Sequence, residues 1–162
     1  MLSRTSRYAL LAAIVLAQRP GEWLTARQLA LATGIPANYL TKILHAMARA
    51  RLLRSQRGRE GGFRLARPPD RIALMEIVSL FEEPNFASYC LLGTGACPAD
   101  RPCVAHSRWL GVIEAVSRFL DETTVAEIAR TPDGTPVGPL TVVASELDQL
   151  ADSVVEGKES CA

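Results

Sequence analysis

Three of the four cysteines and one of the two histidines of this 162-residue chain fall within residues 90–106, which read CLLGTGACPADRPCVAH. Free cysteine often behaves as a small buried hydrophobe, so three unrelated core thiols are the simplest alternative. This segment, however, is rich in Gly, Pro and Asp and has no apolar periodicity that would place three side chains in a core. The pattern therefore predicts a metal or cluster site in a loop, around which the rest of the chain is arranged.

Composition places this cysteine-rich segment in a globular protein. The chain is 48% apolar, which at this length is enough for a packed core. It contains no apolar span of twenty residues, and its first stretch carries Arg4 and Arg7 and lacks a small-residue cleavage site. We therefore expect a cytoplasmic protein that does not bind a membrane. In the reducing cytosol, clustered cysteines are more often metal-binding or catalytic than disulfide-bonded, and three thiols cannot all pair with one another.

The net charge of +1 hides two halves of opposite sign. Residues 1–70 contain twelve Lys or Arg and three Asp or Glu, a net charge of +9, whereas residues 71–162 contain six and fourteen, a net charge of −8. Any one of these side chains can simply be a solvated surface group. Segregation on this scale nevertheless indicates an anionic partner for the N-terminal half, and nucleic acid is the obvious candidate.

Local signals predict three helices in the N-terminal half. Ser3 can cap a helix that runs to about residue 17. Thr25 and Gln28 form a capping-box pattern for a short helix that ends at Gly34, because glycine readily takes a positive φ. A third helix is predicted to begin at Ile35-Pro36 and to run to about residue 50. Two helices separated by a tight glycine turn are typical of a helix-turn-helix, although many all-α domains contain such pairs.

The third helix is predicted to have one apolar and one polar face. Helical spacing places on its buried side Leu40, Ile43, Leu44 and Met47. The same spacing leaves on its outer side Asn38, Thr41, Lys42, His45 and Arg49. An α-helix fits the major groove of DNA, so this outer face is the candidate reading surface.

Two short alternating stretches follow, at residues 52–57 and 62–66, and the sequence Gly-Arg-Glu-Gly joins them. This pattern predicts a β-hairpin with a flexible basic tip, and a helix-turn-helix followed by such a hairpin is a winged helix. An arginine on a narrow wing can enter the minor groove, and Arg57 and Arg59 are placed for that role. A solvated turn or a plain phosphate contact is the alternative for either arginine.

The second half predicts two apolar helices around the cysteine-rich segment. Residues 72–81 are apolar nearly all round, as expected of a helix packed between two parts of the protein. The side chains predicted to be buried are Ile72, Met75, Ile77, Val78, Leu80 and Phe81. The pattern at residues 104–120 predicts the longest helix of the chain. Its apolar stripe consists of Trp109, Val112, Ile113, Val116, Phe119 and Leu120. This stripe indicates that the helix forms the interface of a dimer, because a symmetric dimer would also place two DNA-binding helices on a palindromic site. Packing of this helix onto its own domain is the alternative.

These patterns divide the chain into three parts and predict a mainly α fold with a two-stranded β wing. We expect a winged helix-turn-helix DNA-binding domain at residues 1–70 and a region with the cluster loop and the dimerisation helix at residues 71–130. Residues 131–162 are expected to form a flexible tail. Cys161 lies in that tail and is not expected to join the site.

Four stretches together resemble a known family. They are SRYALLAAIVLA at the start, IPANYLTKIL in the third helix, RGREGGFRLA in the wing, and the three cysteines ending in Cys-x-x-His. These stretches, spread over about residues 1–130, are similar to the winged-helix iron-sulfur regulators typified by IscR and NsrR. The resemblance implies a homodimeric transcription factor whose cluster, bound by Cys90, Cys97 and Cys103, tunes its affinity for promoter DNA. For such a regulator, the residues predicted to contact palindromic double-stranded DNA, which come from the third helix and the wing, are Asn38, Tyr39, Thr41, Lys42, His45, Arg57 and Arg59.

The cysteine spacing departs from the family pattern at one place. The family usually has five residues between successive cysteines, and five separate Cys97 from Cys103, but six separate Cys90 from Cys97. The Gly-Thr-Gly sequence at residues 93–95 is flexible enough to absorb the extra residue. All three cysteines are therefore kept as ligands.

The fourth ligand is assigned to His106. It follows Cys103 by three positions at the start of a helix, so the two side chains share a face and can reach one centre. This position corresponds to the histidine of the IscR-like members, which hold a 2Fe-2S cluster. The NsrR-like members hold 4Fe-4S and use an acidic residue in the first helix, near the place where this chain has Arg7. A 2Fe-2S cluster is therefore favoured, with water or Asp100 as the alternative fourth ligand.

Two functions of different class follow from these residues. The first is a DNA-binding regulator whose iron-sulfur cluster senses redox state, nitric oxide or iron supply. The second is a winged-helix protein stapled by zinc, because three cysteines and a histidine also form a closed tetrahedral zinc set. An enzyme is not expected, since the sequence shows no nucleophile-base pair, phosphate loop or paired carboxylates, and the thiols would be committed to the metal.

Overall fold

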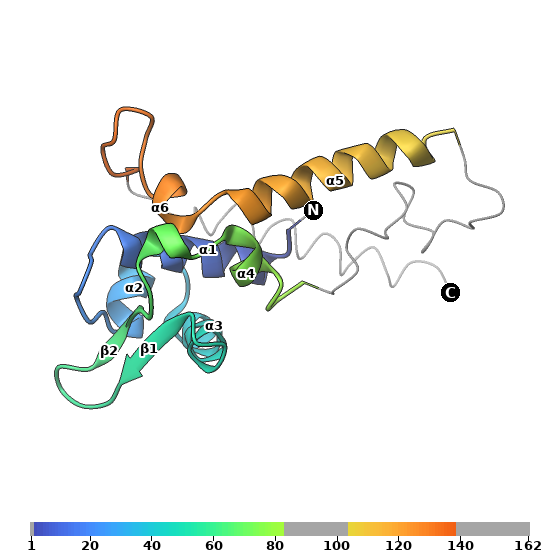
Figure 1. The fold of residues 1–162 in the computed structure, drawn as a ribbon. Coiled ribbons are helices and arrows are strands. Elements are labelled where there is room, and N and C mark those ends of the chain that lie inside the picture. Colours follow the sequence, from blue (N-terminus) through green and yellow to red (C-terminus); the bar gives the residue numbers. More distant parts are fainter. Residues whose placement is uncertain (1, 83–103, 139–162) are drawn as a thin grey trace, which may run out of the picture.

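A computed structural model describes residues 2–82 and 104–138 (Figure 1). Within these ranges the chain forms six α-helices, one 3-10 helix and one two-stranded antiparallel sheet. The predicted mainly α fold with a β wing is confirmed. The three cysteines assigned as ligands lie outside the described residues, as do the other two side chains considered near them or in the tail: Cys90, Cys97, Cys103, Asp100 and Cys161. No helix in the described ranges is long and apolar enough to cross a membrane.

The first two helices begin where the local signals place them. α1 spans Arg4–Ala17, and the side chain of its N-cap residue Ser3 accepts a hydrogen bond from a backbone N–H of the first turn. α2 spans Ala26–Thr33, and Thr25 and Gln28 form the reciprocal capping box that their spacing predicts. Each cap satisfies N–H groups that have no partner inside the helix.

The turn before the third helix also follows its sequence signal. Gly34 ends α2 with a φ of 72°, a conformation that costs glycine little. α3 spans Ala37–Arg49 and begins directly after Pro36. Its buried side chains are the four that helical spacing predicts, Leu40, Ile43, Leu44 and Met47. α2, the turn and α3 therefore form a helix-turn-helix.

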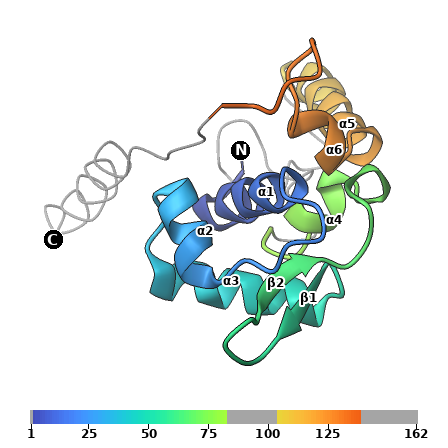
Figure 2. The same cartoon turned by 90° about the vertical axis from the view of Figure 1, so that its left-hand side faces the viewer.

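The wing is a hairpin of β1, Leu53–Gln56, and β2, Gly62–Leu65, whose strands pair antiparallel. A third segment extends this sheet, because Leu24 forms a β-bridge with Phe63. Leu24 N donates to Phe63 O at 3.0 Å, and Phe63 N donates to Leu24 O at 2.8 Å. The loop between α1 and α2 thus holds the wing against the helices (Figure 2).

The predicted helix over residues 72–81 is wrong in extent. A 3-10 helix, η1 (Pro69–Arg71), comes first, and α4 covers only Leu74–Val78. Ile72 is extended because its carbonyl accepts a hydrogen bond from Val125 N at 2.9 Å. Leu80, predicted to be buried, is 38% exposed. Pairing with a distant segment has overridden the local apolar pattern.

The last two helices return the chain to the N-terminal domain. α5 spans His106–Glu122, and α6 spans Val125–Ile128. The amide of Gln18, just after α1, donates to the carbonyls of Ala129 and Val137 at 3.3 and 2.9 Å. The chain that follows α6 is therefore tied to the end of α1.

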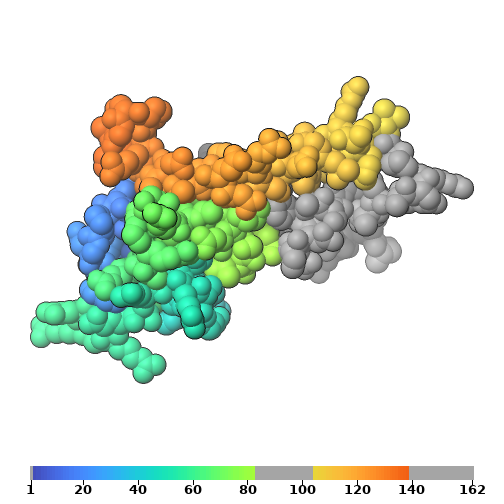
Figure 3. All heavy atoms as spheres, in the orientation of Figure 1, coloured from blue at the N-terminus to red at the C-terminus, as the bar shows by residue number. Residues whose placement is uncertain are grey.

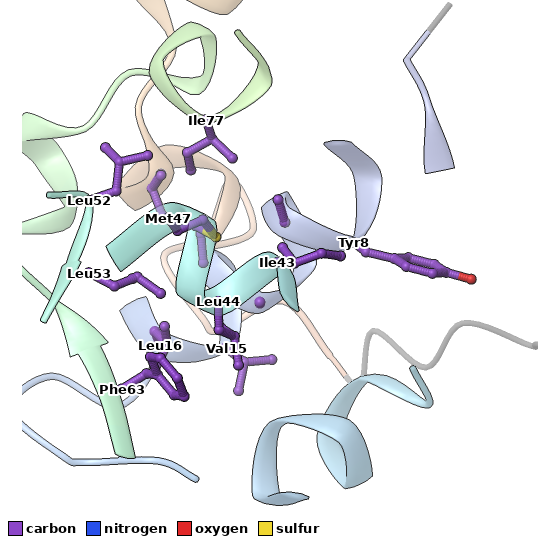
Figure 4. Close-up of a cluster of buried hydrophobic side chains, with 14 of the residues drawn as sticks. Tyr8, Val15, Leu16, Ile43, Leu44, Met47, Leu52, Leu53, Phe63 and Ile77 are labelled. Atoms are coloured by element: carbon purple, nitrogen blue, oxygen red, sulfur yellow. The ribbon is translucent and has the colours of Figure 1, made fainter. Parts of the chain in front are cut away.

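One apolar core joins the two halves of the described chain. Figure 4 shows side chains of α1, α3, α4 and the wing gathered in this core, among them Met47 of α3 and Ile77 of α4. Val78, Leu120 and Val125 belong to the same core and are almost fully buried. Burying an aliphatic side chain of this size contributes about 1.5–3 kcal/mol, so α4, α5 and α6 help to stabilise the winged domain.

The two regions expected to make intermolecular contacts lie on opposite sides of the molecule. α3 and the hairpin occupy one side, α5 crosses the other, and α1 and α4 lie between them (Figures 1 and 2). The hairpin tip projects from the surface below the body of the domain (Figure 3). A partner held at α5 would therefore leave α3 and the wing tip free.

Candidate nucleic-acid interface and metal centre

The exposed side of α3 carries the predicted reading residues. Asn38 and Thr41 are engaged locally, since Asn38 Oδ1 accepts from the next backbone N–H at 2.8 Å and Thr41 Oγ1 donates to a carbonyl one turn earlier at 2.6 Å. Lys42 is exposed and forms no ion pair with any described residue. Arg49, the last residue of the same helix, is likewise exposed and forms no ion pair with a described residue. The face thus presents two unpaired cations beside short polar groups, which suits contact with phosphates or base edges.

Tyr39 links this face to α1. Its hydroxyl is 2.7 Å from Thr5 Oγ1, and its ring meets the ring of Tyr8 edge to face at a centroid distance of 5.7 Å. The side chain is still 38% exposed. Tyr39 therefore fixes the position of α3 on α1 while its outer surface stays accessible to a ligand.

The wing tip presents both predicted arginines to solvent. Arg57 and Arg59 are exposed in the turn between the strands, and Gly58 takes a φ of 108° there. His45 of α3 packs against the wing, with its ring 5.3 Å from that of Phe63 and nearly perpendicular to it. This contact joins the reading helix to the hairpin, so the two parts of the predicted DNA surface have a fixed relation.

Only His106 of the four predicted metal ligands lies in the described residues. It is the first residue of α5 and is partly buried. The donor set itself fits an iron-sulfur cluster, because thiolates hold such clusters and imidazole replaces thiolate in some of them. It also fits zinc, so donor chemistry alone does not separate the two metals.

The segment that carries the cysteines starts from a residue anchored on α1. Glu82, the last described residue before that segment, accepts hydrogen bonds from Ser3 N at 2.7 Å and from Ser6 Oγ at 2.5 Å. Burial by itself raises the pKa of the Glu82 carboxyl, but the hydrogen bonds from Ser6 and Ser3 outweigh it and hold that pKa below its usual value. A negative charge at the N-terminus of α1 also complements the helix dipole.

α5 is only partly covered by its own domain. Leu120 is buried and Val116 packs partly against the core, as the alternative of packing onto the same domain predicts. Val112 and Phe119, one heptad apart, are 51% and 55% exposed. Residues spaced by seven lie on one face of a helix, so an apolar stripe on the outer part of α5 stays open to solvent.

Sequence reasoning missed two contacts, one at the wing and one at the start of the cysteine-bearing segment. The guanidinium of Arg64 lies over the ring of Trp23 at 4.4 Å, and Glu82 anchors the cysteine-bearing segment. Both contacts join residues far apart in the chain. Neither has a local spacing pattern that could have identified it.

Comparison with known proteins agrees with the helix-turn-helix and wing described above. The family model described as "Rrf2: Iron-dependent Transcriptional regulator" matches residues 2–131. A helix-turn-helix transcriptional regulator predicted in Aquifex aeolicus is 32% identical over 130 residues, which are 79% of this chain and 90% of that protein. IscR of Aliivibrio salmonicida is 33% identical over 95 residues, which are 59% of this chain and 56% of that protein.

Two solved structures are similar over most of the chain. One is CymR of B. subtilis, titled the global cysteine regulator, with a TM-score of 0.69 and 27% identity, covering 80% of this chain and 95% of CymR. The other is IscR of T. potens, with a TM-score of 0.63 and 26% identity, covering 78% of this chain and 84% of that IscR. The similarity extends through the winged domain and beyond it.

Proposed function

Because the chain belongs to the Rrf2 family of transcriptional regulators, we propose that it binds promoter DNA with an affinity set by an iron-sulfur cluster. The cluster, of the 2Fe-2S type, is held by Cys90, Cys97, Cys103 and His106. The proposal is supported by the position of the cysteine-bearing segment in the chain. This segment begins at a residue that is hydrogen-bonded to α1, and it ends at α5. α1 also contacts α3, the helix predicted to bind DNA. When bound, the cluster supplies an iron centre that responds to oxidation, nitric oxide or iron supply.

The chain's own contacts offer a route from the segment to the DNA surface. Glu82 holds Ser6 in the first turn of α1, and the neighbouring Thr5 hydroxyl is hydrogen-bonded to Tyr39 of α3. A rearrangement of the segment that pulls Glu82 away would shift α1 and with it α3. Such a change alters DNA affinity only if DNA binds the two arrangements differently.

The DNA-binding part of the proposal rests on Lys42 in the major groove and Arg57 in the minor groove. Arg57→Ala is expected to weaken binding by about 1–3 kcal/mol, mainly at sites with a narrow minor groove, because it removes a cation from that groove. Lys42→Ala is expected to relax base preference. Fluorescence anisotropy with a duplex selected by the protein from random sequences, at several salt concentrations, measures both effects.

Arg71→Ala is the matched control for the arginine change. Arg71 is exposed on η1, which packs against α6, and it belongs neither to α3 nor to the hairpin. Its removal should leave the affinity and the salt dependence as they are. If Arg57→Ala behaves like Arg71→Ala in both respects, the wing takes no part in DNA binding.

We propose that the exposed stripe on α5 forms the interface of a homodimer. Two copies related by a two-fold axis would cover Val112 and Phe119 and would present two α3 helices to a palindrome. Val112→Glu would place a charge in that interface, so it is expected to convert the dimer into a monomer in sedimentation velocity. Leu31→Glu, at a leucine of α2 that is 77% exposed, is the control. A dimer that survives Val112→Glu would exclude α5 as the interface.

The second candidate function is a winged-helix protein in which the same four ligands hold zinc. Its support is the donor set, which satisfies tetrahedral zinc without a further ligand. Zinc would hold together the segment between α4 and α5 and would give no redox response. The two candidates differ in colour, iron content and acid-labile sulfide.

A further inference from the structure

A cavity of about 300 Å³ lies at the base of the wing, between the end of α1 and the outer face of the hairpin. It is lined by four arginines, Arg19, Arg54, Arg64 and Arg67. The described residues that line it include no carboxylate; its remaining walls are apolar or glycine, among them Leu16 and Pro68. The volume is at the lower end of the range for small-molecule sites in proteins.

The pairing of the strands brings two of these arginines close together, which destabilises the hairpin unless an anion is bound. Arg54 and Arg64 are directly opposite each other in the β1–β2 register. Side chains that face each other across an antiparallel pair start only about 5 Å apart, and like charges at such positions are destabilising. A ligand that carries negative oxygens would turn this repulsion into a pair of favourable contacts.

Two of the arginines are already held in place by other groups. Arg64 is stacked on Trp23 at 4.4 Å, and Arg67 Nη2 forms a salt bridge with Glu76 Oε2 at 2.6 Å. Arg19 and Arg54 form no ion pair with any described residue. Two guanidinium groups of the cavity are thus held in position, and the other two form no ion pair with a described residue. Guanidinium groups can hold phosphate or carboxylate oxygens by paired hydrogen bonds.

We propose that this cavity binds a compact organic anion, in which a phosphate or carboxylate group is joined to a small apolar body. The arginines would hold the anionic group, and the apolar walls would contact the body. The site is at the opposite end of the hairpin from the wing tip, so it is separate from the predicted minor-groove contact at Arg57 and Arg59.

Phenyl phosphate is a suitable probe, because it joins a phosphate to an apolar ring. The chain has two tryptophans, so the indole N–H signals of ¹⁵N-labelled full-length protein give two resonances, which a Trp109→Phe spectrum assigns. Titration with phenyl phosphate is expected to shift the Trp23 signal in a saturable way. Sodium chloride at the same ionic strength controls for charge screening, and inorganic phosphate is expected to bind more weakly.

The variant that tests the site is Arg54→Gln, which should weaken phenyl phosphate binding by about tenfold through loss of charged hydrogen bonds. Arg19→Gln tests the same cavity from outside the sheet, should the first variant fold poorly. Arg27→Gln, an identical change at an exposed arginine of α2 that does not line the cavity, should leave the binding unchanged.

Three results would overturn the proposal. A shift that does not saturate, or that sodium chloride reproduces, means that the arginines respond only to ionic strength. Equal binding of phenyl phosphate and inorganic phosphate means that the apolar walls do not select an organic anion. If a DNA duplex displaces phenyl phosphate and Arg54→Gln weakens DNA binding, the cavity is a contact site for the DNA backbone instead.

Discussion

His106→Ala is expected to yield a protein that has lost most of its iron and yet remains a folded dimer. Loss of a partner that only orients a metal ligand typically costs ten- to a hundredfold in affinity, so loss of a ligand itself should cost at least about that much. The fold should persist because His106 begins α5 and does not belong to the apolar core. Iron and acid-labile sulfide per chain, measured in an anaerobic preparation, test the first part. Circular dichroism and sedimentation test the second.

His106→Cys is the informative companion to this change. A thiolate in place of the imidazole should keep a cluster but lower its reduction potential, since nitrogen ligation makes a cluster less negative. The account of the fourth ligand fails if His106→Ala retains a full cluster with an unaltered visible spectrum. The ligand would then be sought at Asp100 or in the partner subunit.

Gly62→Ala is expected to destabilise the winged domain by roughly 2–5 kcal/mol, combining backbone strain with overpacking. Gly62 has a φ of 153°, and a Cβ there would lie 2.5 Å from the carbonyl oxygen of Leu24. Relieving that clash requires the bridge between Leu24 and Phe63 to open. The wing would then lose its attachment to the loop after α1. Chemical denaturation monitored by circular dichroism measures the change in free energy of unfolding.

Gly58→Ala is the matched control within the same hairpin. Gly58 also has a positive φ, of 108°, but a Cβ there would meet no atom within 4 Å. Its substitution should therefore cost only the backbone strain, about 1–3 kcal/mol. Equal costs for the two changes would show that contact with Leu24 does not limit the residue at position 62.

Elements governed by neighbouring residues could be predicted from the sequence. The N-cap of Ser3, the capping box of Thr25 with Gln28 and the left-handed turn at Gly34 each depend on residues within a few positions. The buried face of α3 also followed from helical spacing alone. These features place the helix-turn-helix, and hence the helical part of the candidate DNA surface.

Features that depend on distant pairing could not be predicted in this way. Residues 72–81 read as one helix, yet the carbonyl of Ile72 accepts a hydrogen bond from the first residue of α6, Val125, and α4 begins only at Leu74. The apolar stripe of α5 did not reveal that Leu120 is buried while Phe119 is exposed. The arginines at the base of the wing come from separate stretches of the chain, so only the fold brings them together.

The proposed control of DNA affinity by an iron-sulfur cluster is tested most directly by one paired measurement. The protein is purified without oxygen, its iron and sulfide are quantified, and its affinity for a selected duplex is measured before and after the metal is removed by chelation. We predict a coloured protein with iron and acid-labile sulfide, whose DNA affinity changes by about tenfold or more, equivalent to roughly 1.4 kcal/mol, when the cluster is lost. A colourless protein with one zinc per chain, or an affinity that is the same with and without the cluster, would contradict the account.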